Sequence, residues 1–269
     1  MRISAHPDLT VVVVNHRSVA FLENALRSFC HEERTGNEIE VIVANNDPNE
    51  SESVETLSKR LGFHAIELSE NRGFGAAANV AAAAAHGDIL CFLNPDTEFH
   101  SGSLESVLRM FCGHREVGII GAGLVSGKDD EPEPWSAGET LTFRRLIQNK
   151  IRTFFGWKYR PPCQPIATGW VSGGALFIRR DLFESLKGFD TGFFLYFEDM
   201  DLCLRSREIG YHCVLLPSLS FVHSGGSSRI SDASRKAQYF ASQDRFFAKH
   251  RPKWEGILIR YLRSLSIKS

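Results

Sequence analysis

The chain has 269 residues, 43% of them apolar and 23% charged, which is an ordinary composition for a globular protein. This length suits one large domain, alone or with a small appendage. No apolar run reaches about 18 residues and no signal-peptide core opens the chain, so we expect neither a membrane-spanning helix nor secretion. The six cysteines are scattered without a C-x-x-C pair, which argues against structural zinc and favours a reducing, cytoplasmic location.

The formal net charge of −1 conceals an asymmetry along the chain. From Arg229 to the end there are ten Lys and Arg residues but only three Asp and Glu residues. An acidic body with a basic tail suggests that the tail meets something anionic. A basic helix pair packed on the acidic body explains the asymmetry equally well, and the sequence leaves both readings open.

The first half of the chain alternates strand patterns with helix patterns. Strands are predicted over residues 9–15, 39–44, 63–68, 89–93 and 117–125, and helices over 21–29, 54–61, 75–85 and 104–111. This alternation predicts an α/β domain with a mostly parallel sheet. Ligands of such sheets bind at the carboxyl ends of the strands, where the polar loops 15–18, 45–48 and 94–98 follow.

Residues 126–168 interrupt this alternation. They are rich in proline, glycine and charge and include a basic and aromatic stretch from Phe143 to Tyr159. We interpret them as a long excursion that serves as a flexible lid or acceptor loop. Strands near 170–178, 211–215 and 219–223 and a helix over 181–187 are predicted beyond it.

The tail contains an amphipathic helix that begins after Pro252. Its apolar positions recur every three or four residues, with Lys253, Arg260 and Arg263 off the stripe. Basic amphipathic helices lie on anionic membranes, but such a stripe can also pack onto its own domain. The apolar positions are Trp254, Ile257, Leu258, Tyr261, Leu262 and Leu265.

Three acids, Glu198, Asp199 and Asp201, directly follow a strongly apolar run over residues 192–197. Burial raises the pKa of a carboxyl group toward neutral pH, which makes such acids candidate general bases. A helix that begins here would instead use them to cap its N-terminus. The segment by itself does not decide between the two.

Two further polar clusters suit a bound metal ion or phosphate. Asp96 ends a predicted strand, with Glu98 two residues on, and such acids suit Mg²⁺ or Mn²⁺, although Asn-Pro-Asp-Thr is also good turn chemistry. His223 ends a late strand before a glycine and serine run over 224–228, whose N–H groups and hydroxyls suit phosphate. Residues 71–75, Asn-Arg-Gly-Phe-Gly, precede an alanine-rich helix whose N-terminus can also receive phosphate.

Taken in order, these segments resemble family 2 glycosyltransferases of the GT-A fold, especially the rhamnosyltransferase-like members. The resemblance extends over roughly residues 9 to 250. It implies a single Rossmann-like GT-A domain over 1–228, with a nucleotide-sugar half (1–125), the long loop (126–168) and an acceptor-binding and catalytic half (169–228), followed by a basic helical extension over 229–269. The matching segments are 11–15, 43–46, 71–79, 93–97, 173–180, 188–190, 193–203 and His223 with Gly226 and Ser227.

The resemblance also implies an activity and its residues. The expected reaction is inverting, metal-dependent transfer from a nucleotide-diphosphate sugar, with dTDP-L-rhamnose as the expected donor. The acceptor would be a saccharide or lipid-linked saccharide in bacterial surface polysaccharide synthesis, with peripheral membrane contact through the basic tail and no nucleic acid partner. By resemblance, Asp199 is the base with Glu198 in support, and Asp96 and His223 hold Mg²⁺ or Mn²⁺. The donor-site residues are Asn15, Asn45, Asn71, Arg72, Gly73, Asn79, Asn94 and Asp96, and the acceptor-site residues are Gly173, Gly174, Tyr196, Glu198 and Asp201.

Two departures from the family pattern keep other functions open. Asn45 stands where many relatives carry Asp, and Asn94 replaces the first acid of the D-x-D motif. Both would suit a noncatalytic module that binds sugar nucleotides or glycans, but the intact Asp96, Asp199 and His223 argue against it. A sugar-nucleotide nucleotidyltransferase would share the α/β layout but typically has a glycine-rich basic loop after its first strand, and residues 15–18 contain no glycine.

Overall fold

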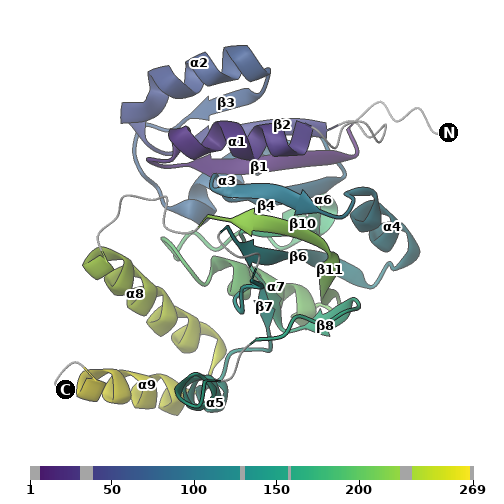
Figure 1. The fold of residues 1–269 in the computed structure, drawn as a ribbon. Helices are drawn as coiled ribbons and strands as arrows, with labels where there is room; N and C mark the ends of the chain where they lie inside the picture. Colours follow the sequence, from purple (N-terminus) through teal and green to yellow (C-terminus); the bar gives the residue numbers. More distant parts are fainter. Residues whose placement is uncertain (1–6, 31–38, 128–130, 157–158, 225–231, 267–269) are drawn as a thin grey trace.

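The computed structural model describes residues 7–30, 39–127, 131–156, 159–224 and 232–266 (Figure 1). The main sheet has the strand order β3-β2-β1-β4-β10-β6-β11-β5, and β8 pairs with β11. Strands β3, β2, β1 and β4 are parallel, as are β6 and β11, whereas β10, β5 and β8 run antiparallel to their neighbours. The strands are β1 (Leu9–Asn15), β2 (Ile39–Asn45), β3 (His64–Glu67), β4 (Ile89–Leu93), β5 (Thr97–Ser101), β6 (Val117–Ser126), β8 (Ile166–Thr168), β10 (Ala175–Arg179) and β11 (His212–His223).

Alternation along the buried strands distributes the helices over both faces of the sheet. Val11 and Val13 of β1 face one core, which α1, α2 and α4 cover. Val12 and Val14 face the other core, which is covered by α3, α6 and α7. The α/β fold with a mostly parallel sheet is therefore confirmed. The covering helices are α1 (Val19–Cys30), α2 (Ser51–Leu61), α3 (Phe74–Ala83), α4 (Glu105–Gly113), α6 (Arg180–Ser185) and α7 (Glu198–Glu208).

Three strand predictions are corrected by the structure. Residues 97–101 form β5, which pairs with β11, and not a loop. The two late strands are one, β11, whose register to β6 shifts between Leu216 and Ser220. The strand expected over 170–178 is interrupted at residues 172–174, so that β9 (Trp170–Val171) pairs with β7 (Ala137–Gly138) in a small sheet of its own.

The excursion over residues 126–168 contains regular elements where it is described. These are β7, β8 and helix α5 (Phe143–Phe154), which begins at the cap residue Thr142. The Thr142 hydroxyl accepts a hydrogen bond from the main-chain N–H of Arg145, which satisfies one of the unpaired donors at the helix start.

Helices α8 (Asp232–His250) and α9 (Lys253–Ser266) pack against the segment that leads into α7. Their apolar contacts form a third core that includes Phe197, Phe246 and Phe247. Figure 1 shows α5, α8 and α9 together at the end of the molecule opposite α2. The C-terminal helices predicted from the sequence are thus present, and α8 is joined directly to the segment that carries the acidic cluster.

Candidate active site

A cavity of about 610 Å³ opens where β1, β4 and β11 end. It collects residues from all three polar loops that follow the strands, as the sheet topology predicts. It also collects residues from the start of α7 and from α8, which lie far away in the sequence. The polar residues and glycines of its lining include His16, Ser18, Asn46, Asn71, Gly73, Asn94, Asp96, Gly173, Gly174, Glu198, Asp199, His223 and Arg235.

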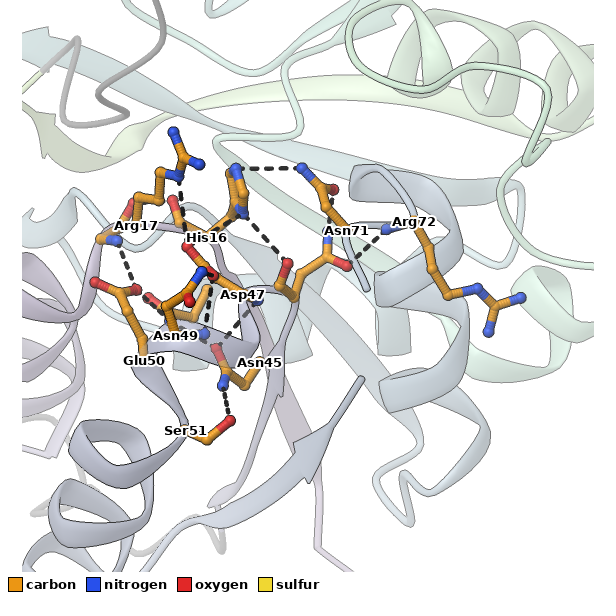
Figure 2. A network of polar contacts seen from close by, with 12 residues as sticks. His16, Arg17, Asn45, Asp47, Asn49, Glu50, Ser51, Asn71 and Arg72 are labelled. Carbon is orange, nitrogen blue, oxygen red and sulfur yellow. Dashed lines mark hydrogen bonds and ion pairs between the residues drawn. The ribbon is translucent and has the colours of Figure 1, made fainter. Parts of the chain in front are cut away.

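A network of amide side chains shapes the part of the cavity wall that follows β1 and β2 (Figure 2). The Asn46 side chain donates to Asn71 Oδ1 at 2.9 Å and to the Gly73 carbonyl at 3.3 Å, and the Arg72 main-chain N–H donates to Asn46 Oδ1 at 2.9 Å. His16 lies against the same group, with Nε2 3.2 Å from Asn71 Nδ2. Sequence reasoning assigned no role to Asn46 or His16, although both lie within the loops that it singled out.

Four predicted donor-site residues do not line the cavity. Asn15 and Asn45 end parallel strands in register, so their amides meet behind the cavity: Asn15 Nδ2 donates to Asn45 Oδ1 at 3.0 Å. Asn79 instead bonds to the main chain of Phe189 at 2.9 Å in both directions. Arg72 contributes its main chain to the network, while its side chain is exposed. These residues support the loops that line the cavity.

Asp199 is held at the start of α7 by two main-chain donors. Gly173 N–H donates to Oδ2 at 2.9 Å, and its own neighbour Met200 donates to Oδ1 at 2.7 Å. Burial raises the pKa of Asp199, although these hydrogen bonds oppose the rise. The carboxyl group is therefore fixed in the cavity wall and gains proton affinity, which is what a general base requires.

Glu198 is buried beside Asp199, and among the described residues its Oε2 has no hydrogen-bond partner. Burial raises its pKa well above the ordinary value, and the charge of Asp199 adds to the rise. A carboxyl group with a raised pKa in the folded state contributes most to stability at pH values below its pKa in the unfolded state. This contribution is lost as the pH rises through the pKa of the folded state. Glu198 is therefore expected to contribute less to stability as the pH rises from acidic to neutral.

Glu198→Gln is accordingly expected to raise the melting temperature at neutral pH. For a chain of this size, relief of about 1 kcal/mol corresponds to about 2–4 °C. Thermal unfolding measured between acidic and neutral pH should show the gain growing with pH. Glu52→Gln, at an exposed position of α2, is the control and should show no such trend. Identical pH profiles for Glu198→Gln and the wild type would contradict this account.

Asp201 was predicted to bind the acceptor, and the structure corrects this. Its side chain is fully buried outside the cavity lining and accepts hydrogen bonds from Arg205 at 2.7 Å, Lys249 at 2.6 Å and His250 at 2.7 Å. Burial alone would raise the pKa of Asp201, but these partners lower it. Asp201 therefore joins α7 to α8.

Asp96 and His223 come together because β5 pairs with β11, with His223 opposite Thr97. His223 Nε2 lies 3.6 Å from Asp96 Oδ1, while Nδ1 lies 3.1 Å from Glu133 Oε2. A carboxylate behind an imidazole fixes the ring and is a common feature of metal sites. Glu133 was missed, because only the fold brings residue 133 to residue 223.

One carboxylate and one imidazole suit Mn²⁺, and Mg²⁺ also binds through one or two carboxylates together with substrate phosphates. Within the part of the chain that is described, no three His, Cys, Asp or Glu side chains form a metal cluster. Glu98 lies on β5 outside the cavity lining. Residues 225–228 of the predicted phosphate-binding run lie outside the described residues.

Aromatic side chains line part of the cavity. Of the residues predicted to bind an acceptor, Gly173, Gly174 and Tyr196 also line it. The sequence did not single out Trp135, Trp170 or Tyr239, which stand outside the matching motifs. Flat aromatic faces with polar edges offer large, rigid contact areas for a ligand such as a sugar ring.

The sheet topology and this cavity define a glycosyltransferase of the GT-A fold. Residues 10–187 match the family described as Glycosyl transferase family 2, and the chain belongs to that family. It is 26% identical over 285 residues to N-acetylglucosaminyl-diphospho-decaprenol L-rhamnosyltransferase of Mycobacterium tuberculosis, covering 97% of this chain and 91% of that protein.

Two further similarities are more partial. The O-antigen biosynthesis protein RfbC of Myxococcus xanthus is 29% identical over 232 residues, which cover 81% of this chain but 17% of RfbC. The crystal structure of GalNAc-T7 with UDP, GalNAc and Mn²⁺ superposes with a TM-score of 0.65 at 16% identity, over 82% of this chain and 44% of that chain. At this identity the second similarity establishes the fold alone.

Proposed function

We propose that this protein is an inverting, metal-dependent glycosyltransferase that moves L-rhamnose from dTDP-L-rhamnose to a saccharide or lipid-linked saccharide acceptor in bacterial surface polysaccharide synthesis. The observation that carries the proposal is one cavity that is lined both by the Asp96 and His223 pair and by Asp199. The printed names of its relatives support rhamnose as the sugar. A cytoplasmic enzyme with a lipid-linked acceptor would work at the membrane surface, and that location is part of the proposal.

The proposed mechanism assigns separate tasks to the residues of the cavity. The amide network of His16, Asn46 and Asn71 positions the nucleotide, and Asp96 and His223 hold the metal ion. A bound divalent cation supplies charge neutralisation at the diphosphate. In the same cavity, Asp199 takes the proton of the acceptor hydroxyl as that oxygen attacks the anomeric carbon. The bond from this carbon to the diphosphate breaks with its electron pair going to the diphosphate, which inverts the centre.

A screen of nucleotide sugars tests the proposal most directly. The protein is incubated with Mn²⁺ and, in turn, dTDP-, UDP- and GDP-sugars, and the released nucleotide is identified. Free dTDP from dTDP-L-rhamnose is the expected product. Release from a different nucleotide sugar would correct the donor, pyrophosphate would indicate a nucleotidyltransferase, and binding without release would favour a noncatalytic module.

Asp96→Ala is expected to remove the effect of metal on nucleotide binding. Titration calorimetry of dTDP with and without Mn²⁺ should show metal-enhanced affinity in the wild type and its loss in the variant. Even residues that only support metal ligands contribute about 10–100-fold to metal affinity, so a direct ligand should contribute at least as much. Glu98→Ala, a neighbouring acid outside the cavity, should behave like the wild type. Equal enhancement by Mn²⁺ in Asp96→Ala would remove Asp96 as a ligand.

A further inference from the structure

Helix α9 turns much of its apolar stripe away from the protein. Trp254, Ile257, Leu258 and Tyr261 are all exposed, with Ile257 at 57%. The residues that face the protein are instead Glu255, Gly256 and Ile259. The stripe is therefore not explained by packing onto the domain. The side chain of Leu265 lies outside the described ones.

Helix α5, which packs on α9, has exposed apolar side chains of its own. Ile151, Phe154 and Phe155 at its C-terminal end are exposed, and Phe154 reaches 85%. The two helices meet near their N-termini, where the Phe143 and Trp254 rings lie 6.2 Å apart and Phe143 N–H donates to Glu255 Oε2 at 2.8 Å (Figure 1). We call the exposed side chains of the two helices the α5–α9 surface.

The exposed charged side chains of the α5–α9 surface are all positive. Helix α5 contains no Asp or Glu, and the only acid of α9, Glu255, is buried and paired with Arg251. Exposed aromatic and aliphatic side chains among cations are the signature of helices that lie in a membrane interface. The exposed charged residues of the two helices are Arg144, Lys150, Arg152, Lys253 and Arg260.

We propose that the α5–α9 surface docks onto an anionic lipid bilayer and lies in its interface. No helix in the described part of the chain is long and apolar enough to cross a membrane, so the contact is peripheral. A second copy is a poorer occupant, because a two-fold interface would bring the same cations face to face. Anionic headgroups instead neutralise each cation near the surface, at about 1 kcal/mol per Lys or Arg.

Docking would bring the cavity close to the lipid. Helix α8 packs on α9 through Arg263, which bonds Asp244 and Gln243 of α8, and α8 also contributes Arg235 and Tyr239 to the cavity wall. One helix thus separates the docking surface from the side of the cavity proposed to receive the acceptor. This last step rests on the proposed function, whereas docking itself does not.

Flotation of the full chain with vesicles tests the proposal. Vesicles of phosphatidylcholine alone are compared with vesicles that also contain phosphatidylglycerol, at low and high salt. We expect binding to the anionic vesicles that weakens with salt. Ile257→Asp should weaken it at least about tenfold, because burial of such a side chain contributes about 1.5–3 kcal/mol. Ile209→Asp is the matched control: Ile209 is exposed to 56%, at the other end of α7 from the cavity, and its variant should bind like the wild type.

Three outcomes would overturn the docking proposal: no binding of the folded wild type to anionic vesicles, equal binding by Ile257→Asp, or equal loss in Ile209→Asp. Sedimentation without lipid adds a fourth, since a wild-type dimer that Ile257→Asp abolishes would assign the surface to a second copy. Release of dTDP from dTDP-L-rhamnose is measured alongside. Unchanged release by a variant that no longer binds vesicles separates docking from catalysis, and absent release in the wild type counts against the proposed function alone.

Discussion

Asp199→Asn is expected to reduce sugar transfer by about 10²–10⁴-fold, the usual contribution of a general base. Asparagine keeps the shape of the side chain and can still accept the hydrogen bond from Gly173 N–H, but it cannot take the proton of the acceptor hydroxyl. Affinity for the nucleotide should stay near that of the wild type, because the amide network and Asp96 are untouched. Turnover by nucleotide release and dTDP affinity by calorimetry measure the two effects separately.

The pH dependence provides a second readout of the same substitution. A base works in its deprotonated form, and burial raises the pKa of Asp199, so the wild-type rate should fall with decreasing pH earlier than an ordinary Asp would dictate. The residual activity of Asp199→Asn should not show this fall in rate with decreasing pH. Glu208→Gln, at the exposed end of the same helix, should keep both rate and profile. If Asp199→Asn moved the sugar at nearly the wild-type rate, the role of general base would be assigned to Glu198 instead.

Asp201→Asn is expected to lower the free energy of unfolding by about 3–5 kcal/mol, the usual cost of removing one partner from a buried charge cluster. The substitution leaves the charges of Arg205 and Lys249, whose side chains are 18% and 33% exposed, facing a neutral amide at a position that is itself fully buried. Because the pKa of Asp201 is lowered in the fold, its contribution is present above the unfolded pKa and is lost as pH falls through the folded value.

Urea unfolding at neutral and acidic pH measures this effect. The difference between wild type and Asp201→Asn should be full at neutral pH and shrink in strong acid. Asp88→Asn is the control, because Asp88 pairs with Arg180 at 3.8 Å on the exposed surface, where such pairs contribute about 0–1 kcal/mol. A loss no greater than in Asp88→Asn would contradict the role of Asp201 as the joint between α7 and α8.

Local patterns were enough to predict most of the fold. The β-branched run of β1 is buried along its full length, and the alanines of α3 pack closely against the sheet. β5 escaped prediction because its residues are polar and half exposed, and it forms only by pairing with β11 at the edge of the sheet. Strands that depend on a distant partner carry little signal of their own.

The difference between local patterns and contacts with distant residues also explains which residues of the candidate site could be predicted. Asp96 and Asp199 stand beside recognisable motifs, and both line the cavity. Asp201 could not be assigned correctly, because its partners Lys249 and His250 lie 48 and 49 positions away. Glu133 could not be predicted as a partner of His223 for the same reason, since 90 positions separate the two residues. Which buried charges meet depends on helix docking and strand register, and no local pattern encodes either.

The backbone just before α7 has a consequence for how Asp199 is positioned. Tyr196 and Phe197 both adopt left-handed conformations, with φ values of 71° and 69°, which cost about 1–3 kcal/mol each for residues other than glycine. Burial of Phe197 against Phe246 of α8 offsets part of that cost. The C-terminal helices thus act as a brace on the residue pair that aims Asp199, although they lie beyond the segment that matches the family. Substitutions in this brace would therefore change the position of Asp199 without altering the strands of the sheet.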